Sequence, residues 1–129
     1  MRGIRSRADR DRGQIIVEFT GMVPIILVTL AAIWQLVLTG YAFTVAGHVA
    51  DEGARAGAAR DGGAAACAAA VRAAAPDGWE VSAQECGGGG KDVFTATVGV
   101  RVPVLFPGAF TVPLTTVHGH AGAAREEEP

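Results

Sequence analysis

The chain has 129 residues, enough for one small domain, and half of them are hydrophobic although only 6% are aromatic. Its formal net charge of -2 is too small to argue for nucleic acid, and we expect no nucleic-acid partner. The charges are unevenly distributed: five of the eleven basic residues precede Gly13, whereas ten acidic and six basic residues follow Phe43.

The first predicted element is an apolar helix. From Ile15 to Tyr41 the only carboxylate is Glu18. A helix of this length spans roughly 40 Å at about 1.5 Å per residue, more than the ~30 Å hydrocarbon layer requires. We therefore expect one transmembrane helix. The positive-inside rule keeps the Arg-rich N-terminus in the cytoplasm and exports the C-terminal part.

A cleaved secretory signal peptide is the alternative interpretation of this segment. The apolar region of such a peptide runs only about 7–15 residues before a small-residue cleavage site. Here apolar residues continue past Ala31 and Ala32 as far as Leu38, which favours a permanent anchor.

A short pattern stands at the start of the apolar segment. Gly13 follows a basic leader, Glu18 is the fifth residue after that glycine, Phe19 comes next, and Pro24 lies early in the helix. These residues resemble the processing site of type IV prepilin-like proteins. Over residues 12–57 the chain more closely resembles the TadE-like family of tight-adherence (Flp-type) pilus assembly proteins of bacteria.

The resemblance implies that a prepilin peptidase cuts between Gly13 and Gln14, and that Glu18, next to Phe19, is the acid used in assembly. Cleavage creates an ammonium group at Gln14, one helical turn from Glu18, and opposite charges in a low dielectric attract strongly. Phe19 replaces the tyrosine common in pilins, and the exported part is longer than in the short major pilins. Both departures indicate a minor pilin-like or assembly component.

The resemblance also implies the partners and the location. The partners are the membrane, a prepilin peptidase, other pilin-like subunits and an inner-membrane assembly platform. The location is the bacterial cell membrane, crossed once, with the N-terminus cytoplasmic and the C-terminal domain extracytoplasmic. The alternative function is a single-pass anchor that presents a small extracytoplasmic binding domain.

Beyond Tyr41 we expect the helix to continue to about Arg60. Five alanines recur there at four-residue spacing, and Gly53 with Gly57 forms a small-x3-small pair. Such a face lets two helix backbones approach closely, but a general bias toward alanine and glycine produces the same pattern. The sequence leaves these two explanations open.

The exported part is predicted to be small and mixed. A second helix covers Ala64 to Ala74, and a turn follows at Pro76-Asp77-Gly78. Period-two alternation predicts a short strand, with one face formed by Trp79, Val81 and Ala83, and a longer strand, with one face formed by Phe94, Ala96, Val98, Val100, Val102 and Val104. After a turn at Pro107-Gly108, a third strand runs from Thr111 to about Ala121.

The predicted fold class is therefore α+β: a long N-terminal transmembrane helix, a short second helix and a small antiparallel three-stranded sheet. We place the boundaries as follows: a basic cytoplasmic leader (1–13), the transmembrane helix with its Ala/Gly-rich extension (14–60), the extracytoplasmic domain (61–123) and an acidic tail (124–129).

Cys67 and Cys86 are the only cysteines, and both follow the apolar segment. On the oxidising side of the membrane, two cysteines in a small domain are expected to form a disulfide. Two unpaired thiols are the alternative.

The sequence offers little support for enzyme chemistry. Four glycines at 87–90 precede Lys91, but a phosphate loop needs Gly at position 85 and Ser or Thr at position 92, where this chain has Glu85 and Asp92. His118 and His120 share a strand face, yet no Cys/His cluster completes a metal site. We expect no catalytic residues, metal, cofactor or small-molecule substrate.

Overall fold

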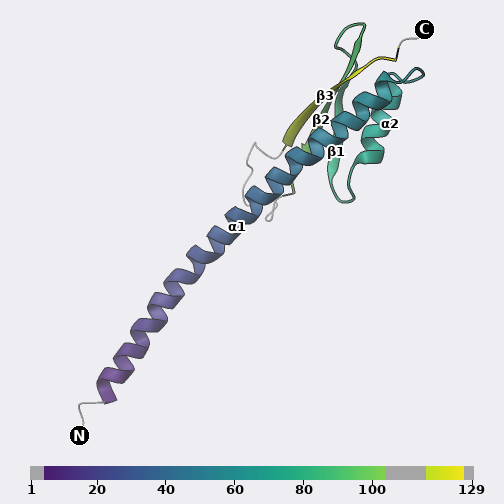
Figure 1. The fold of residues 1–129 in the computed structure, drawn as a ribbon. Coiled ribbons are helices and arrows are strands. Elements are labelled where there is room, and N and C mark those ends of the chain that lie inside the picture. The colour runs from purple at the N-terminus through teal and green to yellow at the C-terminus, as the bar shows by residue number, and fades with distance from the viewer. Residues whose placement is uncertain (1–4, 104–115, 127–129) are drawn as a thin grey trace. The chain divides into compact units, whose positions relative to one another are not determined.

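The computed structural model describes residues 5–103 and 116–126, with side chains from Ile15 onward. Five elements follow one another along the chain: α1 (Arg5–Ala58), α2 (Ala64–Ala74), β1 (Glu80–Cys86), β2 (Val93–Arg101) and β3 (Thr116–Ala124). The strands form one antiparallel sheet in the order β1-β2-β3 (Figure 1). The predicted fold class is confirmed.

The chain divides into two units, Met1–Gln35 and Leu36–Pro129. In the first unit the described apolar side chains of α1 are largely exposed: Ile15 is 65% exposed, Phe19 69% and Val28 69%. The helix is long and apolar enough to cross a membrane, judged by its length and composition. A helix that is apolar all round, with no protein covering it, is what a lipid environment accommodates.

The end of α1 is defined by two glycines. The helix stops at Ala58, two residues before the expected end near Arg60. The Gly63 N–H donates to the Gly57 carbonyl at 2.9 Å, and Gly63 has a φ of +95°. Gly63 is also the residue that directly precedes α2, so this bond ties the start of α2 to the end of α1 and satisfies a carbonyl that the helix leaves unpaired.

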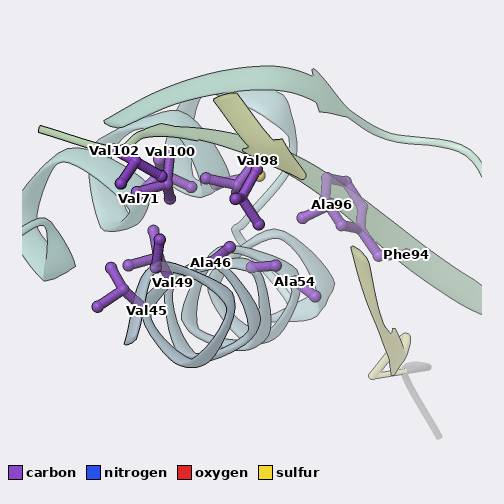
Figure 2. Packing of buried hydrophobic residues seen from close by; sticks show 14 of the residues in the cluster. Val45, Ala46, Val49, Ala54, Val71, Phe94, Ala96, Val98, Val100 and Val102 are labelled. Carbon is purple, nitrogen blue, oxygen red and sulfur yellow. The ribbon is translucent and has the colours of Figure 1, made fainter. Parts of the chain in front are cut away.

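The second unit has one hydrophobic core. One side of this core is formed by the alanine ladder, meaning the five alanines of α1 that recur at four-residue spacing. The buried face of the helix consists of Ala42, Val45, Ala46, Val49, Ala50, Ala54 and Ala58. Figure 2 shows the side chains of β2 pointing toward this face. The sequence left open whether the alanine spacing marks a packing face or a compositional bias. In this chain it marks a packing face, because the chain's own sheet covers the alanine ladder.

The expected inner face of β2 is confirmed over the described residues. The buried side chains are Phe94, Ala96, Val98 and Val100 of β2, and Val102, which follows the strand. On β3 the odd-numbered residues turn inward, led by Val117, and the strand continues past Ala121 to Ala124. The predicted positions of Val104, of the turn at Pro107-Gly108 and of strand residues 111–115 lie outside the described residues.

Three glycines allow the close approach of helix and sheet. A Cβ atom at Gly119 of β3 would overlap the carbonyl group of Ala46 in α1. One at Gly57 would overlap the ring of Phe94, and one at Gly53 would lie 2.8 Å from a methyl group of Val71. The small-x3-small pair of α1 therefore receives side chains from β2 and α2.

Candidate processing and assembly site

The residues predicted for processing lie on α1. The Gly13–Gln14 peptide bond falls within this helix, eight residues after its first residue, Arg5. Glu18 and Phe19 have exposed side chains on the same helix. Because residues four apart in a helix share a face, Gln14 and Glu18 lie one above the other, about 6 Å apart at the backbone.

The spacing of Gln14 and Glu18 would permit an ion pair after cleavage. If the chain began at Gln14, its ammonium group would stand at the N-terminus of the helix, one turn before the carboxylate of Glu18. Among the described side chains of this helix from Ile15 to Gln35, none is cationic.

The second predicted site, the disulfide, is present. Cys67 of α2 and Cys86 of β1 are bonded, with their Cα atoms 6.0 Å apart. Cys67 is completely buried and Cys86 is partly buried against the core. The bond joins α2 to the edge strand of the sheet and closes a loop with a sequence separation of 19.

A β-bulge makes this bond geometrically available, and the sequence reasoning missed it. Ala83 pairs with Val98 and Glu85 pairs with Thr97, so Gln84 is an extra residue without a partner. In a regular strand Val81 and Cys86 would face opposite sides, because an odd number of positions separates them. The bulge returns Cys86 to the inner face. The signal in the sequence was this odd separation between two residues that both had to point inward.

The outer face of the sheet holds the two histidines. His118 and His120 are exposed on β3, and His120 Nδ1 lies 2.9 Å from the Thr97 hydroxyl oxygen. Within the described parts of the chain, no three His, Cys, Asp or Glu residues gather in an arrangement that could hold a metal ion. The pair is thus part of a polar, solvent-facing surface on this side of the sheet.

Two further contacts appear only in the folded chain. The rings of Tyr41 and Trp79 meet edge to face, with centroids 5.3 Å apart. At the other end of the sheet the Arg125 guanidinium lies over the Phe94 ring, 5.2 Å from its centroid, and the Glu126 N–H donates to the Ala58 carbonyl at 3.1 Å. Neither pair follows a local spacing, so periodicity could not indicate them.

Comparison with models of known protein families places a match in the first part of the chain. The family model described as TadE-like protein matches residues 13–55, which begin at the predicted cleavage glycine and end within the buried part of α1. No curated protein and no solved structure matches the chain significantly. The resemblance predicted from the sequence is confirmed over this segment.

Proposed function

From the TadE-like character of residues 13–55, we propose that this chain is a minor pilin-like, structural component of a tight-adherence pilus assembly system. It is anchored in the bacterial cell membrane by α1, with the N-terminus cytoplasmic and the sheet outside the cytoplasm. A prepilin peptidase removes residues 1–13. Its partners are other pilin-like subunits and the inner-membrane platform that assembles them.

One observation carries the proposal: the family match covers a helix with two kinds of surface. Up to Gln35 the described apolar side chains have no protein cover, while from Ala42 onward one face of the same helix is buried under the sheet. Such a helix is suited to two tasks. Its exposed segment spans lipid or packs against the helices of neighbouring subunits, and its buried segment holds a folded domain on the far side.

The proposed role of Glu18 follows from charge and depth. A carboxylate in a membrane helix costs about 2.5–3.5 kcal/mol at the bilayer centre, and less near the interface. Pairing with the ammonium group of the processed N-terminus offsets that cost. Within one subunit the pair stabilises the mature end. Between neighbouring subunits it fixes their axial register.

Proteolytic maturation is tested by finding the mature N-terminus. The full chain is produced with its cognate prepilin peptidase, isolated from membranes and analysed by intact-mass and N-terminal peptide mass spectrometry. We expect residues 1–13 to be absent and Gln14 to be the first residue, with an amino group that is unmodified or methylated and therefore still charged. A chain that still begins at Met1, or one cut after Ala32, would contradict the proposal.

A matched pair of variants makes the test specific. Gly13→Leu places a bulky side chain at the scissile bond and should abolish cleavage. Gly3→Leu makes the same change elsewhere in the leader and should leave it intact. If an uncleaved chain supports normal pilus assembly, processing is dispensable and the anchor with a binding domain becomes the better explanation.

A further inference from the structure

The aromatic pair of Tyr41 and Trp79 links α1 to the start of β1. Tyr41 lies on α1 and is 51% exposed, although its neighbour Ala42 is completely buried. Trp79 directly precedes β1 and is partly buried against the core. Their rings meet edge to face at 5.3 Å between centroids. The two rings therefore hold a common position within the second unit.

The depth of Tyr41 in a membrane can be estimated from exposed residues of the same unit. Leu36 and Val37 of α1 are 72% and 61% exposed, so their side chains need an apolar environment outside the protein. Tyr41 follows Leu36 by five residues, which is about 8 Å along a helix. The polar layer on each side of the ~30 Å hydrocarbon core is roughly 5–8 Å thick. If Leu36 lies at the hydrocarbon boundary, Tyr41 lies in the headgroup layer.

Charged residues lie close to Trp79 on both sides, with Asp77 two residues before it and Glu80 directly after it. Glu80 follows it, and its Oε2 accepts a hydrogen bond from Nη1 of Arg101, 2.6 Å away, in an exposed ion pair on the opposite strand. Tryptophan and tyrosine prefer the membrane interface because one end of each ring is apolar and the other donates a hydrogen bond to water or headgroups. An apolar ring between charged residues is the composition that suits this interface.

We propose that Trp79 and Tyr41 together contact the lipid headgroup layer. The start of β1 then rests on the extracytoplasmic surface of the membrane that α1 crosses. This inference rests on the proposed membrane anchoring by α1 and adds a second contact from the exported domain. Because the ion pair of Glu80 and Arg101 is balanced, the contact depends on the rings and requires no anionic lipid. Two attachments from different elements restrict how far the domain can tilt on its anchor.

Depth-dependent fluorescence quenching tests the proposal, because the chain has only two tryptophans. The full-length Trp34→Phe variant, with Trp79 as its sole tryptophan, is reconstituted in phosphatidylcholine vesicles. The quenchers are a nitroxide on the headgroup, a nitroxide on the acyl chain and aqueous acrylamide. We expect Trp79 to be quenched at least twofold more by the headgroup nitroxide than by the acyl-chain nitroxide. Acrylamide should quench it at least twofold less than it quenches the urea-unfolded chain.

The complementary Trp79→Phe variant separates this proposal from the anchoring on which it rests. Its sole tryptophan, Trp34, is expected to be quenched most strongly by the acyl-chain nitroxide. If Trp34 behaves in this way but the headgroup nitroxide does not quench the fluorescence of Trp79, the headgroup contact is refuted and the membrane anchoring by α1 is still supported. If lipid nitroxides quench neither residue, both are refuted. In each variant the thiols are counted after alkylation, and an intact disulfide shows that the domain has folded.

Discussion

Cys67 and Cys86 come within 6.0 Å of each other at their Cα atoms because one extra residue, Gln84, interrupts the alternation of β1. Without that residue the strand would turn Cys86 toward solvent, on the side of the sheet away from α2. The disulfide therefore depends on the bulge.

Deleting Gln84 should abolish the disulfide. The deletion restores regular alternation and moves Cys86 to the outer face, out of reach of Cys67. Alkylation of the denatured, non-reduced protein with a thiol-specific mass tag should add two tags per chain, against none for the unaltered protein. Deleting Gly90 shortens the chain equally but beyond Cys86, and it should leave the bond in place. An intact bond in the Gln84 deletion would contradict the assigned register.

Loss of the bond itself should be costly for so small a core. In the chain-entropy model, closing a loop of this size stabilises the folded state by about 3 kcal/mol. The Cys67→Ser/Cys86→Ser double variant should lose about that much free energy of unfolding in urea titrations. Trp79 fluorescence in a Trp34→Phe background provides the signal. Reduced wild-type protein should unfold at nearly the same urea concentration as the double variant, and a large difference would point to repacking around serine.

Gly119→Ala should destabilise the domain by roughly 1–3 kcal/mol, because a Cβ atom there overlaps the Ala46 carbonyl and forces β3 away from α1. The matched control is Gly122→Ala on the same strand. There the nearest atom is a side-chain methyl group of Val93 at 3.3 Å, which can move. The same urea titration should show a clear loss for the first variant and little change for the second. Equal effects would mean that the close approach of helix and strand is not limiting.

Arg125 should contribute to stability through Phe94. A guanidinium over an aromatic ring is worth about 0.5–1 kcal/mol at an exposed site. Arg125→Ala should cost about that amount in the wild-type background and almost nothing when Phe94 has been replaced by Leu. A double-mutant cycle built from the four urea titrations measures the coupling directly. Additive effects of the two substitutions would show that the stacked geometry contributes no energy.

Glu18→Gln should leave membrane insertion intact and impair pilus assembly. Insertion becomes easier by ~1–3 kcal/mol, depending on depth, because a charge is removed from the proposed membrane segment, whereas the proposed partner of the processed N-terminus is lost. Carbonate-resistant membrane association and the amount of sheared surface pili are the two measurements. Glu52→Gln, which removes a different acid from α1, is the control and should leave pilus yield unchanged. Normal piliation by the Glu18 variant would refute the assembly role.

The sequence alone determined the features that depend on local pattern. The apolar run from Ile15 to Tyr41, in which Glu18 is the one carboxylate, predicted the long helix. Period-two alternation predicted the inner face of β2, because backbone geometry acting on neighbouring residues imposes both patterns. Gly13 and Glu18 are recognisable for the same reason: their fixed spacing is retained whatever the fold around them.

The tertiary structure decided everything that depends on distant residues meeting. It showed that the ladder from Ala42 to Ala58 packs against this chain's own sheet, which the spacing of alanines could not distinguish from a face for a second helix. It also required the bulge at Gln84 and the pairing of Tyr41 with Trp79. These features follow from the close packing of one helix against one sheet, which fixes positions in space that are far apart in the chain.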